Sequence, residues 1–296
     1  MIKFNGRAGR PWDDREDRLV TRARLLETRG DVEALVRYGH ATASKPDFGG
    51  AEPDYRSVIC HDMRGAVSQP TLAGEGFGVF AHRTNVTAFD DGYAIASVYL
   101  DEVRDLIRGV AGTDQVFMQQ NWVLRSEMRD FSSHEVTGGR HAMSMKTGGF
   151  VHLDYDDEAA EAWARYTLEK HGVTERPEGR LLVITAWRSL SPPPQDKPLA
   201  LIDRRTVRTD SYIREAIRSP LFDWTGYQIA YDPAHRFCWW SDMQSDELIL
   251  FLQHEGGYPP DRARRTPRLT IRAASARCRR ARASRCAPTR SCGIER

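Results

Sequence analysis

The sequence lacks the features of several large protein classes. It contains no run of 18 apolar residues, so no membrane-spanning helix is predicted. Met1–Arg10 has no apolar segment, and we therefore expect no secretory signal. Only Cys60 and Cys238 occur before residue 261, and no CxxC pair is present, which argues against a disulfide framework and against a zinc finger or ribbon. Together these absences predict a cytoplasmic protein with reduced cysteines.

The signature loops of nucleotide-binding proteins and of serine hydrolases are also missing. The sequence contains no GxGxxG motif and no phosphate-binding P-loop, so a nucleotide cofactor has no basis in it. It has no GxSxG elbow, so a Ser-His-Asp hydrolase is not indicated.

Charge is unevenly distributed along the chain. The 296 residues carry a formal charge of +2, but residues 261–296 contain 12 arginines, no lysine and only two acids. The preceding 260 residues therefore form a mildly acidic body. After Tyr258 the periodic apolar residues end, and a segment of this composition cannot bury enough apolar surface to offset its ordering entropy. We expect residues 261–296 to be a disordered tail.

Residues 1–260 are expected to form one domain that is mainly β with supporting helices. Residues 1–55 are interpreted as a helical or irregular N-terminal part, with one or two exposed helices over residues 14–39. Residues 56–260 would contain the β core and further helices.

Strand-like segments predominate in the second half of this body and are separated by turns. A capped helix is predicted over residues 156–172, a short helix over 211–217 and a Gly/Ser/His-rich loop over 132–149. The pattern favours a β-barrel or jelly-roll core.

The segment VHLDY (151–155) is the clearest candidate for chemistry. On a strand end, His152 and Asp154 project to the same side and can bind one metal ion together. His235, about 80 residues later at the start of HRFCWW, is the expected third ligand. Two histidines and one carboxylate leave positions open on the metal, an arrangement typical of non-haem Fe(II) oxygenases.

Other interpretations of this motif are open. A chain with 9 histidines and 41 acids has about one His-x-acid motif by chance, and the pair could be solvated loop residues. The same three ligands would also suit a zinc hydrolase or isomerase, or a non-catalytic metal-binding β-barrel protein that assists a partner enzyme.

Several blocks of the sequence, in this order, resemble the AsaB/CmcJ-like family of hydroxylases and desaturases, non-haem iron enzymes of fungal and bacterial secondary metabolism. The resemblance covers about residues 55–253. The blocks that carry it are CHDMRG (60–65), LAGEGFGVFAHRTNVTAFDD (72–91), VHLDY (151–155), TAWRSL (185–190) with KPLALIDRRTV (197–207), and YDPAHRFCWWSDMQSDELILF (231–251).

The resemblance implies a double-stranded β-helix, a jelly-roll and cupin-like fold. It implies Fe(II) held by His152, Asp154 and His235, with 2-oxoglutarate as co-substrate and O2 as oxidant. The expected activity is hydroxylation or desaturation of a small-molecule metabolite, as in antibiotic biosynthesis. The expected partners are this substrate and either a biosynthetic enzyme or a second copy of the chain, with no membrane and no nucleic acid.

The far carboxylate of 2-oxoglutarate needs a cation, and the planar fork of an arginine suits it because it can bond both oxygens. Many such oxygenases place this cation about ten residues after the last histidine, but Ser245–Gln253 contains no lysine or arginine. Arg188, beside Trp187 on a predicted central strand, is the first candidate, and a surface ion pair is its alternative role. Arg125 is the second candidate.

The resemblance ends near Asp261, where the arginine-rich tail begins. Family members usually continue with a "HtxF.dP" segment and a further strand, whereas this chain reads RRTPRLTIRAASARCRR. A shifted reading frame would account for both the lost pattern and the charge, whereas a basic arm for nucleic acid or a membrane would account for the charge alone. This departure from the family sequence affects the part of the chain that would close the barrel, and hence the expected activity.

Overall fold

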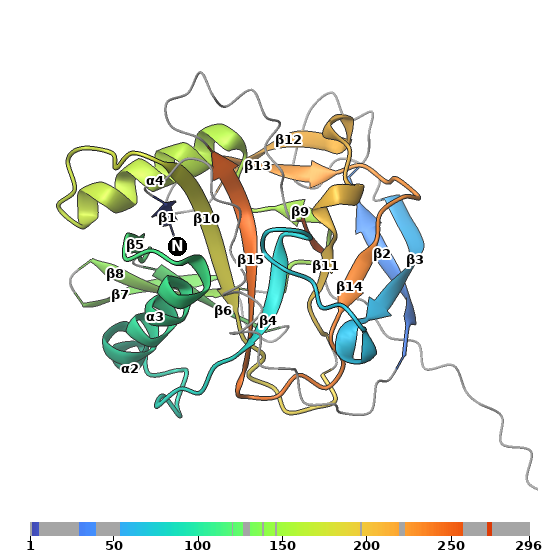
Figure 1. The fold of residues 1–296 in the computed structure, drawn as a ribbon, viewed down its shortest axis with the longest axis horizontal. Helices are drawn as coiled ribbons and strands as arrows, with labels where there is room; N and C mark the ends of the chain where they lie inside the picture. Colours follow the sequence, from blue (N-terminus) through green and yellow to red (C-terminus); the bar gives the residue numbers. More distant parts are fainter. Residues whose placement is uncertain are drawn as a thin grey trace, which may run out of the picture.

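The computed structural model describes residues 2–5, 30–39, 54–119, 121–126, 131–137, 139–145, 147–195, 197–218, 223–256 and 271–273. Two β-sheets face one another in its centre (Figure 1). Of the two longer helices, α3 (Leu100–Ala111) packs on the face of the five-stranded sheet that points away from the other sheet, and α4 (Asp157–Lys170) packs on the opposite face of that sheet, against Leu181 and Val183. This mostly-strand architecture confirms the predicted jelly-roll class.

The first sheet has five strands, joined through antiparallel pairs. Its central strands carry apolar runs because they are covered on both faces, as the buried residues from Leu181 to Ile184 show. In spatial order the strands are β4 (Phe77–Ala81), β15 (Glu247–Gly256), β10 (Arg180–Trp187), β1 (Ile2–Asn5) and β5 (Val116–Phe117).

The second sheet has eight strands and draws them from both ends of the chain. Among its described strands, only β14 and β3 pair in parallel. In spatial order the strands are β12 (Tyr212–Ile217), β13 (Trp224–Ile229), β9 (His152–Leu153), β16 (Ile271–Ala273), β11 (Ala200–Ile202), β14 (Phe237–Trp239), β3 (Asp54–Asp62) and β2 (Val32–Tyr38).

The core is divided by the faces of the sheets. Phe77 and Phe251 of the five-stranded sheet pack against Leu201 and Trp240 in the space between the two sheets. The opposite face of the eight-stranded sheet carries a second cluster, which we call the Tyr38 cluster: Ala34, Val36, Tyr38, Cys60, Val151, Leu153, Ala200, Ile202, Ile229, Phe237 and Trp239. Strand alternation thus gives the large sheet two apolar faces.

The helices cover the five-stranded sheet. Asp91 caps α2 (Gly92–Ala94), which continues through a π-helical turn, η2 (Ile95–Tyr99), into α3 (Leu100–Ala111). Asp156 caps α4 (Asp157–Lys170) by accepting a hydrogen bond from the Ala159 N–H. Three short 3-10 turns complete the helical elements of the described residues: η1 (Met63–Gly65), η3 (Arg204–Thr206) and η4 (Thr209–Ser211).

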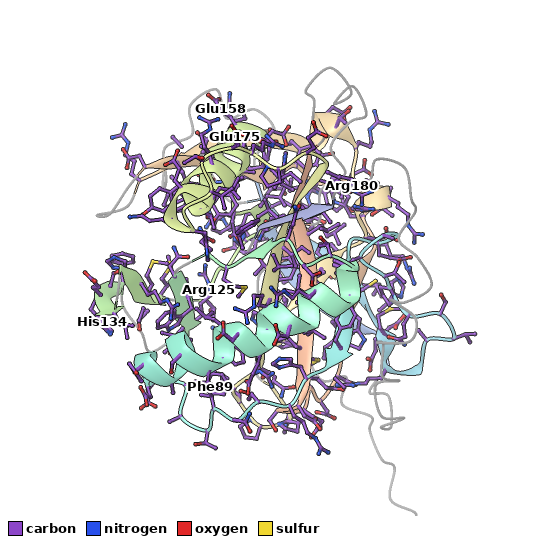
Figure 2. All side chains as sticks on the ribbon, turned by 60° about the vertical axis from the view of Figure 1, so that its left-hand side comes forward. Phe89, Arg125, His134, Glu158, Glu175 and Arg180 are labelled. Carbon is purple, nitrogen blue, oxygen red and sulfur yellow. The ribbon has the colours of Figure 1, made fainter. Side chains whose placement is uncertain are left out.

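A small third sheet borders the helices. It consists of β6 (Asn121–Arg125), β8 (Arg140–Met145) and β7 (Ser132–Thr137), in that order. Figure 2 shows this sheet beside α3, with His134 at its outer edge and Arg125 nearer the body of the molecule. Across the described part of the chain, no helix combines the length and apolar character required to cross a membrane.

Three local predictions were wrong. The predicted helix over residues 14–39 falls partly outside the described residues, and its described part holds β2, whose buried Ala34, Val36 and Tyr38 alternate with less buried neighbours as in a strand. Residues 212–217 form β12, because pairing with β13 overrides their helical propensity. The predicted loop over 132–149 contains β7 and β8.

The limits of the single domain and the nature of the tail stay predictions. Most of residues 261–296 lies outside the described residues. The described piece, β16, pairs with β11 on one side and with β9 on the other.

Candidate metal centre and adjoining cavity

His152 is held in a fixed orientation on β9. It is 8% exposed, and its Nδ1 lies 2.8 Å from the backbone carbonyl oxygen of Phe150. A carbonyl can only accept a hydrogen bond, so Nδ1 carries a proton, and in the neutral ring the lone pair is on Nε2. Nε2 lies 3.4 Å from Oδ1 of Asp154. The ring therefore presents a metal-binding nitrogen beside a carboxylate oxygen.

Asp154 follows β9 directly and is fixed from two sides. Gln253 donates from Nε2 to Asp154 Oδ2 at 2.5 Å, and Trp224 donates from Nε1 to the Asp154 carbonyl at 2.7 Å. The backbone of β9 passes so close to β13 that position 226 requires glycine. A Cβ at Gly226 would lie 2.7 Å from the Leu153 carbonyl oxygen.

The pair fits two positions of a metal site. Imidazole nitrogens and carboxylate oxygens bind transition metals at about 2.0–2.2 Å, so one ion can contact two donor atoms that lie 3.4 Å apart. The His152 Nδ1–H and Asp154 Oδ2 are each hydrogen-bonded on the side away from the shared space. Such outer hydrogen bonds are how proteins orient metal ligands.

His235 does not join this pair. Within the described ranges, no three His, Cys, Asp or Glu residues lie together as a metal-binding group. The reason is the face of the sheet: His235 stacks on Tyr38 of the Tyr38 cluster, with ring centroids 5.7 Å apart. Val151 and Leu153 belong to that same cluster, and His152 alternates with them, so it points to the opposite side.

The surroundings of His235 are those of a core residue. It is 9% exposed, and the Tyr38 hydroxyl lies 3.3 Å from its Nδ1. Its Nε2 is buried without a hydrogen-bond partner in the described structure. Burial lowers the pKa of His235, and the charge of Asp232 opposes this only in part. The side chain is thus a packed imidazole whose surroundings favour its neutral form.

A cavity of about 550 Å³ adjoins Asp154. Its wall lies between β10, the small sheet and the start of α3, and it contains both apolar and polar side chains. The aromatic members are Phe89, Tyr99, Trp122, Tyr155 and Trp187, and the cationic members are Arg125, Arg188 and Lys197. Asn121 also lines the cavity. A volume of this size suits a small organic ligand.

Arg188 lines this cavity, but its donor groups are occupied by the protein. Its Nε donates to the Tyr99 hydroxyl at 3.0 Å, Nη1 donates to the Ser245 carbonyl, and Nη2 donates to the His82 carbonyl at 2.9 Å. The guanidinium also lies over the Tyr99 ring, 5.4 Å from its centroid. Arg125, on β6, lines the same cavity. The structure thus places both predicted cations at the cavity and gives Arg188 a bracing role.

His61, His134 and His254 also lie outside this centre. His61 pairs with Asp31 at 2.7 Å, and His134 is exposed. His254 is buried between Asp157 and Glu161 of α4, with Nδ1 3.2 Å from Asp157 Oδ1 and Nε2 3.6 Å from Glu161 Oε1. This last contact fastens the start of α4 to β15.

Sequence reasoning missed Gln253, Thr185 and Lys197. Gln253 contacts Asp154, and the other two line the cavity. A glutamine within the apolar run ELILFLQ is the signal that could have identified the first, because an uncharged polar residue in a buried strand needs a specific partner. The other two positions carry no comparable signal.

Comparisons with known proteins indicate which proteins the chain is similar to. A family model described as "Oxidoreductase/YMDC permease-like domain" matches residues 27–285. The chain is 26% identical to "Hydroxylase/desaturase efuI" of Hormonema carpetanum, over 74% of this chain and 77% of that protein. It is 27% identical to "Alpha-ketoglutarate-dependent dioxygenase tstK" of Talaromyces stipitatus, over 67% of this chain and 71% of that protein.

The fold resembles solved structures of one iron enzyme. The iron and alpha-ketoglutarate-dependent endoperoxidase NvfI, in a structure titled "with different conformation", matches with a TM-score of 0.60 and 17% identity, over 85% of this chain and 91% of that one. A variant of the same enzyme with one tryptophan replaced by phenylalanine matches with a TM-score of 0.59 over the same shares. At this identity the match concerns the fold.

Proposed function

The chain belongs to the oxidoreductase family described as "Oxidoreductase/YMDC permease-like domain", and from this premise we propose that it is an Fe(II)- and 2-oxoglutarate-dependent oxygenase. It is a non-haem iron enzyme of the AsaB/CmcJ-like hydroxylase and desaturase type, which oxidises a small-molecule metabolite. Its cofactors are Fe(II), 2-oxoglutarate and O2. Named relatives include a hydroxylase/desaturase and two alpha-ketoglutarate-dependent dioxygenases.

One observation carries the proposal at the level of residues. His152 Nε2 and Asp154 Oδ1 lie 3.4 Å apart, and Asp154 lines a cavity of about 550 Å³. We propose these two side chains as iron ligands. His235 is not included, because its ring packs on the opposite face of the sheet. The described residues therefore supply two protein ligands.

When bound, the iron with 2-oxoglutarate and O2 supplies the oxidising power, which no protein side chain provides. The chain's own residues hold and orient the reactants. The apolar and aromatic cavity wall limits water around the reacting atoms, and it positions the metabolite next to the Asp154 carboxylate. Hydroxylation and desaturation would both begin from that position.

The anchor for the far carboxylate of 2-oxoglutarate is proposed to be Arg125. It lines the cavity from β6, and the competing Arg188 guanidinium is bonded to Tyr99, Ser245 and His82. Arg188 is kept as the second candidate. Replacing each with glutamine and measuring the KM for 2-oxoglutarate separates them: the anchor variant raises this KM, and the bracing variant lowers the thermal stability instead.

The proposed function is tested by coupled turnover. The full chain is supplied with Fe(II), ascorbate, 2-oxoglutarate and a panel of small metabolites, and succinate formation is measured. Substrate-dependent succinate that disappears in Asp154→Ala supports the oxygenase. Tight zinc binding with hydrolysis and no succinate would instead favour a zinc hydrolase.

The cellular setting is a further part of this proposal. Cys60 and Cys238 are both buried thiols outside any disulfide, a state typical of a reducing compartment. This supports a cytoplasmic enzyme. A partner enzyme or a homodimer stays a prediction from the sequence.

A further inference from the structure

Gln253 occupies an irregular position in β15, next to the proposed metal ligands. In the pairing of β15 with β10, Leu252 lies opposite Ile184 and His254 lies opposite Val183. Gln253 is therefore the extra residue of a β-bulge and has no partner in the ladder. Bulges next to active sites commonly redirect a side chain.

The redirected side chain clamps Asp154. Gln253 Nε2 donates to Asp154 Oδ2 at 2.5 Å, while Gln253 Oε1 accepts from the Asp154 backbone N–H at 3.4 Å. The same Nε2 lies 3.3 Å from the Thr185 hydroxyl on β10. Only one orientation of the Gln253 amide satisfies both contacts with Asp154. A flipped amide would place its oxygen against the Asp154 carboxylate oxygen and its NH2 group against the Asp154 backbone N–H.

The clamp is enclosed by protein. Gln253 is 1% exposed, so its amide has no water to replace a lost partner, and an unmade hydrogen bond would cost its full desolvation penalty. The clamp engages Oδ2 of Asp154 and leaves Oδ1 facing His152. The two carboxylate oxygens thus have different roles.

We propose that Gln253 is a positioning residue that makes Asp154 a ligand through Oδ1 alone. The inference rests on the proposed function, because it presumes that His152 and Asp154 hold a metal ion. By occupying Oδ2, the amide prevents the carboxylate from binding the metal with both oxygens. One further coordination position is thereby kept for 2-oxoglutarate or O2.

The test uses Co(II) as a spectroscopic probe with the full chain. Gln253→Glu keeps the size but removes the donor, and Gln253→Leu removes the amide altogether. Both variants should bind Co(II) about 10–100-fold more weakly, the usual range for residues that orient metal ligands. In Gln253→Leu, the visible d–d absorption of bound Co(II) should also weaken, because a two-oxygen carboxylate raises the coordination number.

Gln69 provides the matched control. Its amide donates to the Met63 carbonyl at 2.6 Å and accepts from Trp240 Nε1 at 3.2 Å, and it is absent from the cavity lining. Gln69→Leu should lower thermal stability and leave the Co(II) affinity and spectrum unchanged. Where Gln253→Leu does not fold, Gln253→Met preserves the chain length and the packing.

The outcomes are distinguishable. A wild-type chain that binds Co(II), with Gln253 variants of unchanged affinity and spectrum, overturns the role of Gln253 and leaves the oxygenase intact. A wild-type chain that binds neither Co(II) nor Fe(II) overturns both. Weaker binding together with an equal change in the Gln69 control shows a general loss of structure and also overturns the positioning role.

Discussion

The two faces of the eight-stranded sheet around β9 carry histidines of opposite character. His152 faces Asp154 and Gln253, with its Nδ1 bound to a carbonyl and its Nε2 beside a carboxylate. His235 packs on the other face against Tyr38, and its Nε2 has no hydrogen-bond partner among the described residues. Both are almost fully buried, so burial does not distinguish them.

The difference shows what makes a buried histidine a candidate ligand. Its second nitrogen must be fixed by a hydrogen bond, and its free nitrogen must face another donor that can share a metal. His152 meets both conditions. His235 lacks the second, although both were predicted from sequence as members of one site. Spacing along the chain could not reveal which face each residue occupies.

The largest effect is expected on metal binding. His152→Ala should reduce the affinity for Co(II) or Fe(II) by more than about 100-fold, the upper range for residues that merely orient ligands. His235→Ala should leave it within about twofold, as expected for independent sites. Isothermal titration of the two variants measures both effects. Equal losses of metal affinity would place the two histidines in one site and contradict their assignment to opposite faces of the sheet.

The order of effects should reverse for stability. His235→Ala removes a ring that stacks on Tyr38 in a buried cluster, and about 2 kcal/mol of unfolding free energy should be lost. His152→Ala should cost less, because His152 does not stack on Tyr38 and points away from the Tyr38 cluster. Chemical denaturation with urea compares the two, and a larger loss in His152→Ala would contradict the assignment of His235 to the core.

The dependence of the unfolding free energy on pH should distinguish the buried histidines from one another. Burial lowers the pKa of His235, so the unfolded chain binds this proton more readily, and stability falls as the pH drops below the ordinary value of 6.5. His235→Gln should flatten this acid-side loss. Measuring the unfolding free energy from about pH 7 down to pH 5 tests this.

His254 provides the control of opposite sign. Burial lowers its pKa, but hydrogen bonds to Asp157 and Glu161, and the charges of these acids, outweigh burial and raise the pKa overall. Its contribution is therefore complete below pH 6.5 and is lost as the pH rises through the raised pKa. His254→Gln should lower the unfolding free energy most at low pH. An equal loss of unfolding free energy at every pH would count against ion pairs between His254 and the two acids.

The smallest effect is expected on substrate binding in the cavity, from Trp122. The indole nitrogen of Trp122 is buried in the cavity wall without a hydrogen-bond partner within the described part of the chain. Trp122→Phe should retain stability, while the KM of a metabolite that accepts this hydrogen bond should rise about fivefold, equivalent to about 1 kcal/mol. Steady-state kinetics with an identified substrate measures this, and an unchanged KM would assign Trp122 to packing.

The sequence was most informative where a local pattern had a single physical solution. Asp156, the acids after it and Gly172 predicted α4 nearly to the residue, and the apolar run from Leu181 to Ile184 predicted a central strand. The resemblance to a family predicted the jelly-roll class, and the fold confirms it.

Long-range placement accounts for what the sequence did not reveal. Val32–Tyr38 was expected to be helical because residues 14–39 are charge-rich with scattered Leu and Val. It forms a strand through pairing with β3, which begins about 16 residues after its end, across a segment without periodic signal. The clamp on Asp154 depends on a bulge in a strand 99 residues away. Neither the strand pairing nor the contact with Asp154 can therefore be predicted from the sequence next to the residues involved.

The place of β16 has a consequence for the continuity of the eight-stranded sheet. This strand is the last described one along the chain, yet it lies inside the eight-stranded sheet, between β9 and β11 (Figure 1). Without residues 271–273 that sheet would consist of two halves with exposed edges at β9 and β11, and edges of this kind invite pairing with other chains. The enclosure of the strand that carries His152 therefore depends on the last described strand of the chain.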